Sequence, residues 1–308
     1  MTNRVVLNGK TVNVTQLSMP RLLRYGDIVA ILATSGPCDP IRLSAGVDAV
    51  KSMGLVPWVM ESCHLRHGYL AGADDMRLRD LHAAFAAPYV RGIFVARGGY
   101  GAGRLLPGLD FELLGRNPKV FVGYSDVTAL HIAITQACGF ITFHGPMVAA
   151  DFGRGQDTMD ALQDMIFESL PRGAKQWRIP ALGQPLTTIV PGRATGPLTG
   201  GNLSLLAASL GTPYEINTKG SILFIEEIDE PPYRIDRMLL QLKQAGKLAD
   251  AAGIILGDFT PQTPKTLQIC INELIIPEGK PTLAGLSCGH TLPNITLPIG
   301  LTVSMCAT

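Results

Sequence analysis

The chain has 308 residues, enough for two domains of ordinary size, and 46% of them are hydrophobic with a mean hydropathy of +0.23, which supplies a large core and excludes a disordered chain. Its 26 basic and 25 acidic residues nearly cancel, and no basic run is interleaved with aromatic residues, so a nucleic-acid partner is not expected. The N-terminus lacks the apolar core of a signal peptide and no later apolar run approaches the roughly eighteen residues that span a bilayer, so we expect a cytoplasmic protein without membrane contact.

In chain order, the residues from Gly26 to Pro146 alternate short apolar runs typical of buried strands with longer segments of helical periodicity. Continuous apolar strands separated by helices indicate a parallel sheet that is covered on both faces. We therefore predict a doubly wound α/β domain over residues 1–170. Its strands are predicted within residues 26–36, 56–60, 91–99, 119–125 and 140–146, and its helices within 41–54, 74–87, 126–139 and 157–170.

The helical periodicity stops at Pro171, where a stretch rich in proline and glycine begins. We predict that residues 171–196 form a linker and that a second, smaller domain of mixed α and β structure occupies residues 197–308. That second domain has helical patterns at 200–211 and 233–246 and strand patterns at 221–228 and 251–259.

Six cysteines are scattered through the chain without any C-x-x-C pair, a distribution that argues against both a disulfide framework and a zinc site. His64 and His67, in CHLRH, have a spacing that can bind a metal on a helix, but no second ligand cluster accompanies them. We expect reduced thiols, no metal ion, and a polar surface loop at residues 63–67.

The segment VFVGYSDVTALH, residues 120–131, places Ser125 between a predicted strand and a predicted helix. Serine at such a position ordinarily caps the helix, its oxygen accepting a backbone N–H. It also fits the nucleophile elbow, in which a serine hydroxyl projects from a sharp strand-to-helix turn. Gly123 supplies the tight turn, but Val127 stands where the G-x-S-x-G pattern has its last glycine, so the pattern alone leaves both interpretations open.

A glycine-rich loop, RGGYGAG at 97–103, directly follows the apolar run GIFVA. Such loops let backbone N–H groups approach either a dinucleotide or an oxyanion. A dinucleotide fingerprint needs a glycine where this chain has Arg104, and it needs an acidic residue at the end of a strand about twenty residues on, which is missing. The pattern therefore disfavours a nicotinamide cofactor and leaves an oxyanion as the ligand of the loop.

A serine nucleophile needs a base, and two of the six histidines suit the edge of a sheet, His144 in TFHGP and His290 in CGHT. The histidines inside helical patterns are interpreted as ordinary surface or core residues. For the acid, FIEEIDE presents four carboxylates, and Glu226 and Glu227 are favoured because a carboxylate in an apolar strand is costly to bury without a partner. The residues alone do not choose within either pair.

Seven motifs, in this order, resemble the LD-carboxypeptidase family, peptidase family S66, and the similarity runs from about Pro20 to the last predicted strands. The motifs are GYLAG at 68–72, RGGYGAGRLL at 97–106, GYSDVTALH at 123–131, TFHGP at 142–146, GPLTGGNLSLL at 196–206, LFIEEIDEPPYRIDRMLLQL at 223–242 and GHT at 289–291. The resemblance implies a flavodoxin-like or Rossmann-like N-terminal domain joined to a smaller β/α domain. It also implies a triad between the two, with Ser125 as nucleophile, Glu226 as acid and His290 as base.

The resemblance has further implications for the site. Backbone N–H groups of Gly99 and Asp126 are expected to form the oxyanion hole, and neither a metal nor an organic cofactor is required. The family often has Glu-Asp where this chain has Glu226 followed by Glu227, a departure that leaves the triad untouched. Separately, Asn202 in the GGN turn is predicted to line the substrate pocket.

The family's activity implies a serine peptidase that cleaves the amide between an L-centre and a C-terminal D-amino acid, releasing D-alanine from murein tetrapeptide in cell-wall recycling. Hydrolysis of microcin C-type peptidyl nucleotides, which confers self-immunity, is the first alternative. A non-catalytic binding module in which Ser125 only caps its helix is more remote. The family also implies a homodimer. Arg234 and Arg237 are candidates for binding the substrate carboxylate, although salt bridges with neighbouring acids are the favoured explanation.

Overall fold

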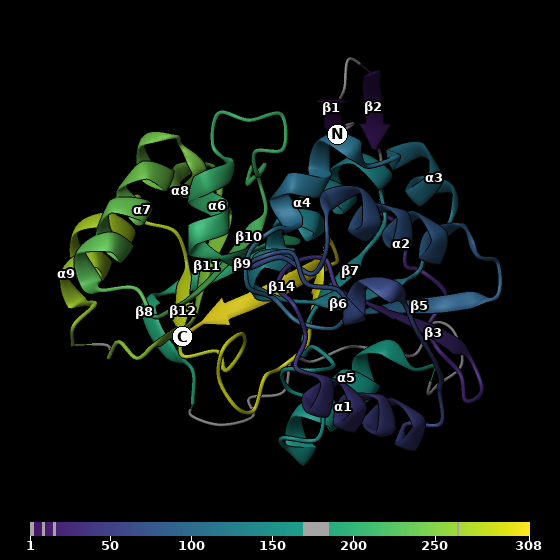
Figure 1. The fold of residues 1–308 in the computed structure, drawn as a ribbon. Helices are drawn as coiled ribbons and strands as arrows, with labels where there is room; N and C mark the ends of the chain where they lie inside the picture. The colour runs from purple at the N-terminus through teal and green to yellow at the C-terminus, as the bar shows by residue number, and fades with distance from the viewer. Residues whose placement is uncertain (1–2, 8–9, 15–16, 169–184, 264) are drawn as a thin grey trace.

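The computed structural model describes residues 3–7, 10–14, 17–168, 185–263 and 265–308, which form two six-stranded sheets flanked by helices (Figure 1). A separate antiparallel hairpin, β1 (Asn3–Leu7) and β2 (Lys10–Val14), precedes the two sheets. In these ranges no helix combines the length and the apolar character needed to cross a membrane. The α/β class predicted from the sequence is confirmed.

The first sheet has the strand order β13-β7-β6-β5-β3-β4, and all neighbours pair in parallel except β13, which runs antiparallel to β7. Counted along the chain, its first five strands follow the flavodoxin-like order 2-1-3-4-5. In such a sheet the strand order reverses between β3 and β5, and ligands bind there, outside the carboxyl ends of the strands. The strands are β3 (Ile28–Leu32), β4 (Val56–Val59), β5 (Val90–Val95), β6 (Val120–Gly123), β7 (Thr142–His144) and β13 (Leu297–Ile299).

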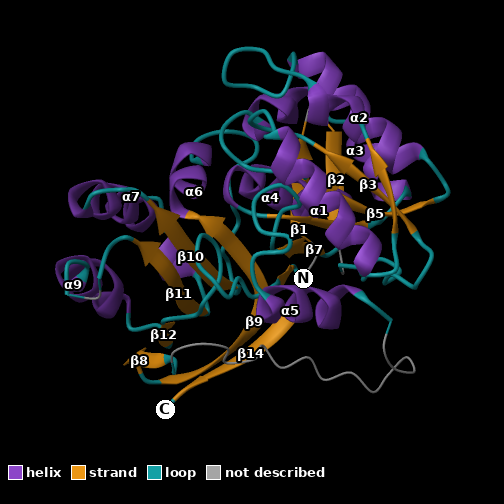
Figure 2. Ribbon diagram, turned by 60° about the horizontal axis from the view of Figure 1, so that its bottom comes forward, coloured by secondary structure: helices purple, strands orange, loops and turns teal. Residues whose placement is uncertain are grey.

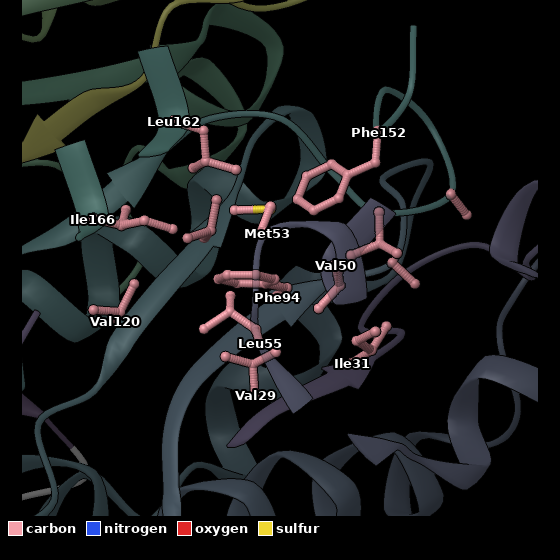
Figure 3. Close-up of a cluster of buried hydrophobic side chains, with 14 of the residues drawn as sticks. Val29, Ile31, Val50, Met53, Leu55, Phe94, Val120, Phe152, Leu162 and Ile166 are labelled. Atoms are coloured by element: carbon pink, nitrogen blue, oxygen red, sulfur yellow. The ribbon is translucent and has the colours of Figure 1, made fainter. Parts of the chain in front are cut away.

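One face of the first sheet is covered by α1 (Pro40–Ser52) and α5 (Gln156–Ile166), which lie below the sheet in Figure 1. Alternate residues of a strand point to opposite faces, so Val29 and Ile31 share this one. Together with Phe94 they are fully buried against apolar side chains of both helices (Figure 3). This cluster is the first of two cores that hold the N-terminal part of the chain together.

The opposite face of the same sheet is covered by α2 (Asp74–Ala86), α3 (Phe111–Arg116) and α4 (Thr128–Cys138). Ala30 and Leu32, the alternate residues of β3, are buried in this second core. Strands that are apolar on both sides need helices on both sides, which is why the sequence shows continuous apolar runs rather than alternation. The predicted doubly wound architecture is confirmed.

The second sheet has the order β14-β9-β10-β11-β12-β8, in which the four central strands are parallel and the two edge strands are antiparallel to their neighbours. Helices cover one of its faces, and they lie at the left of the molecule in both Figure 1 and Figure 2. The strands are β8 (Thr187–Val190), β9 (Gly192–Asn202), β10 (Ile222–Ile228), β11 (Gly253–Thr260), β12 (Thr282–Ala284) and β14 (Thr302–Ala307), and the helices are α6 (Leu203–Ser209), α7 (Pro232–Gln244), α8 (Lys247–Asp250) and α9 (Gln268–Cys270).

Part of the predicted linker belongs to the second sheet. Residues 187–190 and 192–196 are strand residues in β8 and in the first half of β9, whereas 171–184 lie outside the described residues. Proline and glycine suggested an irregular segment, but both residues are tolerated in edge strands and bends, and β8 is an edge strand. Conversely β13, from the predicted second domain, lies in the first sheet. The domain limits themselves stay predictions.

Candidate active site

Ser125 lies on the turn between β6 and α4, and its φ angle of +63° puts its backbone in the left-handed region. A residue other than glycine pays about 1–3 kcal/mol for such a conformation, which persists only where the surroundings fix it. The N-cap residues of the short helix Ser125–Val127 and of α4 are Tyr124 and Val127, and neither makes a side-chain capping bond. The turn therefore has the geometry of a nucleophile elbow rather than that of a serine-capped helix.

Ser125, His290 and Glu226 are joined by two hydrogen bonds. His290 Nε2 lies 3.0 Å from Ser125 Oγ, and His290 Nδ1 lies 2.9 Å from Glu226 Oε2. An ionised carboxylate can only accept, so Nδ1 carries the imidazole proton and Nε2 is free to accept the proton of the serine. The structure brings together the three side chains that the resemblance named, from the turn after β6, from β10 and from the loop before β13.

The Glu226 carboxylate is fully buried in β10. Burial raises the pKa of this carboxyl, and the neighbouring His290 opposes that change because it stabilises the ionised form. Gly289 lets the loop that carries His290 lie close to Glu226. The φ angle of Gly289 is +105°, and a β-carbon on this residue would lie 2.5 Å from Glu226 Oε2. A larger residue at 289 would displace either the acid or the base.

Glu227, the alternative acid, points to the opposite side of β10 because successive residues of a strand alternate. Its Oε2 accepts hydrogen bonds from the backbone N–H of Ser204 at 2.8 Å and from the Ser204 hydroxyl at 2.6 Å. These donors lie in the first turn of α6, where a negative charge is favourable. The geometry thus brings Glu226 to the histidine and uses Glu227 to hold α6.

Asn202, the predicted pocket residue, is 3% exposed and occupies the N-cap of α6. Its side-chain oxygen accepts the Leu205 N–H at 3.4 Å, and its side-chain nitrogen donates to Glu227 at 2.8 Å. Its amide is therefore engaged within the protein, and contact with a substrate stays a prediction for this residue.

His144 and His131 have surroundings different from those of His290. His144, the alternative base, is fully buried and packs edge-on against Phe224 with ring centroids 5.3 Å apart, and no described residue is a hydrogen-bond partner for its ring nitrogens. His131 of α4 donates from Nε2 to the carbonyl of Gly123 at 2.7 Å and accepts at Nδ1 from the Thr142 hydroxyl at 2.8 Å. Burial lowers the pKa of His131 to about 4, so it is a neutral group that fixes the end of β6.

The glycine-rich loop after β5 lies beside the nucleophile. A β-carbon on Gly98 would lie 3.2 Å from Ser125 Oγ, a close approach that sequence analysis did not single out. Gly99, the predicted oxyanion donor, follows it with a φ of +114°. The N–H of Gly36, in the loop after β3, donates to the carbonyl of Gly98 at 3.1 Å. The loops after β3 and β5 thus meet beside the nucleophile, at the edge where a doubly wound sheet binds its ligands.

The arginines considered for the substrate carboxylate are Arg234 and Arg237, and the residues considered for metal binding are His64 and His67. Arg234, at the surface of α7, pairs with Glu230 at 3.3 Å. This is the salt bridge with a neighbouring acid that the sequence analysis favoured for this arginine. Within the part of the chain that the structure describes, no three His, Cys, Asp or Glu side chains gather into a group that could hold a metal ion.

Comparison with known proteins identifies the family. Residues 29–145 match the model of the LD-carboxypeptidase N-terminal domain, and residues 195–305 match that of the LD-carboxypeptidase C-terminal domain. A Bacillus subtilis (strain 168) protein named as a probable murein peptide carboxypeptidase is 44% identical over 292 residues, which cover 93% of this chain and 91% of that protein. The chain belongs to the LD-carboxypeptidase family. It is accordingly a serine carboxypeptidase, and the resemblance seen in the sequence is confirmed.

Solved structures share the whole arrangement of this LD-carboxypeptidase. The muramoyltetrapeptide carboxypeptidase from Oxalobacter formigenes is 31% identical, with a TM-score of 0.76 over 91% of this chain and 95% of that one. An MccF-like protein from Bacillus anthracis str. Ames is 29% identical, with a TM-score of 0.84 over 94% of this chain and 96% of that one. Both sheets are therefore common features of the family fold.

Proposed function

We propose that this LD-carboxypeptidase removes the C-terminal D-alanine from murein tetrapeptide, with Ser125, His290 and Glu226 as its catalytic triad. The observation that carries the proposal is the pair of hydrogen bonds, 3.0 Å and 2.9 Å long, that connects the serine to the carboxylate through the imidazole. The substrate is supported by the names of the Bacillus subtilis and Oxalobacter formigenes relatives, which refer to murein peptide and to muramoyltetrapeptide.

In the first half-reaction, His290 Nε2 accepts the proton of Ser125 as Oγ attacks the carbonyl carbon of the scissile amide. Glu226 Oε2 accepts the hydrogen bond from Nδ1–H, which fixes the tautomer and stabilises the imidazolium. The imidazolium then protonates the amine of the departing D-alanine and leaves an acyl group on Ser125. A water molecule deprotonated by the same imidazole releases the shortened peptide and restores the serine.

Negative charge develops on the carbonyl oxygen in both half-reactions. We assign its stabilisation to the backbone N–H groups of Gly99 and Asp126, because Asp126 follows the nucleophile in the same turn and the glycine loop lies against Ser125. Loss of one such donor typically lowers kcat by about 10²–10³-fold. The φ of +114° at Gly99 is a conformation that a larger residue would adopt only with strain.

Hydrolysis of a microcin C-type peptidyl nucleotide is the second candidate function, and the likeness to the MccF-like protein from Bacillus anthracis favours it. The same triad would attack an amide in a different acyl group, since a fold and its catalytic groups do not fix the substrate. The two candidates are separated by comparing kcat/KM for murein tetrapeptide and for an aminoacyl-sulfamoyl adenylate. We expect the tetrapeptide to have the higher value.

Substitution of the nucleophile tests the proposal. Wild-type protein should release free D-alanine from L-Ala-γ-D-Glu-meso-diaminopimelate-D-Ala, and Ser125→Ala should lower kcat by at least about 10⁴-fold because the covalent pathway is lost. Free D-alanine is measured by mass spectrometry. The matched control is Ser52→Ala, the same change at an exposed residue of α1, which should leave kcat unchanged.

Two outcomes would contradict this proposal separately. Wild-type protein that releases no D-alanine would exclude murein tetrapeptide as the substrate. Equal release by wild type and Ser125→Ala would exclude Ser125 as the nucleophile. The proposal also includes a cytoplasmic location, where fragments of recycled cell wall would reach the enzyme, and a homodimer, both of which the family resemblance supports.

A further inference from the structure

Arg77 of α2 is fully buried, and its guanidinium connects two loops at the carboxyl edge of the first sheet. Nη1 donates to the carbonyl of Thr34, just after β3, and at 3.0 Å to the carbonyl of Gly101, in the glycine-rich loop after β5. Nη2 pairs with Asp74 in the first turn of the same helix. A guanidinium is costly to bury unless fixed partners accept its hydrogen bonds, so Arg77 and these two carbonyls hold one another in place.

Asp126 holds the same loop from the other side. It is 2% exposed, and its Oδ2 accepts the N–H of Ala102 at 2.7 Å. Burial raises the pKa of this carboxyl. Three interactions favour its ionised form: the hydrogen bond from the Ser35 hydroxyl, the hydrogen bond from the Ala102 N–H, and the charge of Arg77. The Gly101 carbonyl and the Ala102 N–H belong to one peptide group, so that single group is held by a cation at one end and by an anion at the other.

The loop has little freedom at this peptide. Gly101 has a φ of +133°, and a β-carbon there would lie 2.7 Å from Arg77 Nη1 and 2.6 Å from the Leu70 side chain. Gly99, one assigned oxyanion donor, lies two residues before the clamped peptide, and the other donor is the backbone N–H of Asp126 itself. Contacts that fix the 101–102 peptide relative to Asp126 therefore also set the spacing of the two donors.

We propose that Arg77 and Asp126 are positioning residues of the oxyanion hole, which clamp the Gly101–Ala102 peptide against the nucleophile turn and so fix the Gly99 and Asp126 N–H groups relative to the substrate carbonyl. The inference rests on the proposed function. The Arg77 and Asp126 side chains act through the backbone and do not touch the reacting atoms. Because the donors stabilise charge that exists only in the transition state, loosening the clamp lowers kcat and leaves KM nearly unchanged.

Arg77→Lys is the first test, because it keeps the positive charge beside Asp74 and Asp126. An ammonium group lacks the planar fork of a guanidinium and does not reach both carbonyls. We expect kcat for D-alanine release to fall by about 10- to 100-fold, as displacements of about 1 Å do, with KM within about threefold of wild type. The matched control is Arg79→Lys, two residues on in α2, whose side chain is 52% exposed and which should keep the wild-type kcat.

The Arg77→Lys result is decisive in either direction. A folded Arg77→Lys protein with unchanged kcat overturns the inference, and so does a loss that resides in KM, since that outcome would assign Arg77 to substrate binding. Folding is monitored by the melting temperature from circular dichroism.

Substitution of Asp126 tests the other half of the clamp. Asp126→Asn keeps an oxygen that accepts the Ala102 N–H, whereas Asp126→Ala removes it. We expect kcat to decrease in the order wild type, Asp126→Asn, Asp126→Ala, with the alanine variant lower by about 100-fold or more, the usual loss for an oxyanion donor. Equal kcat in the two variants overturns the clamp. If Asp126→Ala fails to fold, kcat of Asp126→Asn and of Arg77→Lys decides the question, with the melting temperature showing that each variant is folded. Both variants keep a hydrogen-bonding group at the substituted position.

A second reaction separates this inference from the choice of substrate. Diisopropyl fluorophosphate forms a bond from Ser125 Oγ to phosphorus, with loss of fluoride and transfer of the serine proton to His290, and its phosphoryl oxygen uses the same N–H donors. The labelling rate is followed by intact-protein mass. Slower labelling of Arg77→Lys supports the clamp even if wild type releases no D-alanine, an outcome in which only the substrate assignment fails. Equal labelling rates for wild type and Arg77→Lys overturn the clamp.

Discussion

At the scale of single residues, the strained backbone of Ser125 is fixed by hydrogen bonds on both sides of it. The N–H of Gly145 donates to the carbonyl of Gly123 at 3.0 Å, and the N–H of Val127 donates to the carbonyl of Tyr124 at 3.2 Å. The ring of Tyr124 also packs edge-on against the His290 imidazole, with centroids 4.9 Å apart. The residue before the nucleophile therefore supports the turn with its backbone and the base with its side chain.

The buried imidazole of His131 should make the folded protein less stable as the pH falls. Burial lowers the pKa of His131 to about 4, whereas an unperturbed histidine titrates near 6.5. Between these values the unfolded chain binds a proton that the folded protein does not. The stabilisation is complete above about pH 6.5 and is lost progressively as the pH falls toward 4, by about 3 kcal/mol in total.

Urea unfolding of wild type and His131→Gln between pH 7.5 and 4.5 measures this contribution. Glutamine can donate to the Gly123 carbonyl and accept from the Thr142 hydroxyl without titrating, so its free energy of unfolding should depend less steeply on pH. His67→Gln, at an exposed residue, serves as the control and should follow wild type. Parallel curves for wild type and His131→Gln would show that another group causes the pH dependence.

At the scale of elements, the position of α1 depends on a close contact between its backbone and the segment after β7. A β-carbon on Gly46 would lie 2.1 Å from the carbonyl oxygen of Val148 and 2.7 Å from its carbonyl carbon. The obstacle is backbone and cannot rotate away, so any side chain at position 46 would move the helix relative to the sheet. The position of α1 over one face of the first sheet depends on this glycine.

Gly46→Ala should therefore destabilise the protein, by about 1–3 kcal/mol, the usual range for overpacking, although alanine is the better helix former. Gly115→Ala is the matched control because Gly115 also lies in a helix, α3, but its nearest non-local atom would be 3.5 Å away, an ordinary contact. That change should stabilise by up to about 1 kcal/mol. Urea unfolding at pH 7.5 gives both values, and a stable Gly46→Ala protein would contradict the packing argument.

The packing of helices and strands also limited how much of the site could be predicted from the sequence. The choice between Glu226 and Glu227 depends on which side of β10 faces the histidine, a property set by the register of a distant strand. Composition and spacing left that choice open, and only the family resemblance favoured Glu226. Arg77 carried no signal at all, since an arginine in a charged helical segment is indistinguishable from a surface residue until its burial is known.

At the scale of the whole molecule, the parallel strands of the first sheet could be predicted because each is a continuous apolar run next to a helix, and so could β10 and β11 of the second sheet. The parallel strands β9 and β12 carried no such signal. The antiparallel strands could not be predicted either. β13 has only three residues, Leu297–Ile299, and pairs with Thr142–His144, about 150 residues earlier in the chain. β8 lies in a segment whose proline and glycine suggested a linker. Short strands of this kind owe their pairing to tertiary contacts, which leave no periodicity in the sequence.

We expect the intact protein to be a homodimer, as the family resemblance implies. Size-exclusion chromatography with multi-angle light scattering should give a mass of about twice the chain mass of 32.9 kDa. A dilution series serves as the control, since a specific dimer interface of standard size resists dilution through the micromolar range. A constant mass of 32.9 kDa at every concentration would contradict the dimer.

The return of the chain through β13 has a consequence for protein engineering. Within a few residues after His290, the chain pairs with β7 in the first sheet at Leu297 and then with β9 in the second sheet at Thr302. The base is thus anchored to both halves of the molecule. Chimeras that exchange the C-terminal half between relatives would introduce a foreign β13 opposite a native β7, and the imidazole would keep its position only where the two strands were transplanted as a pair.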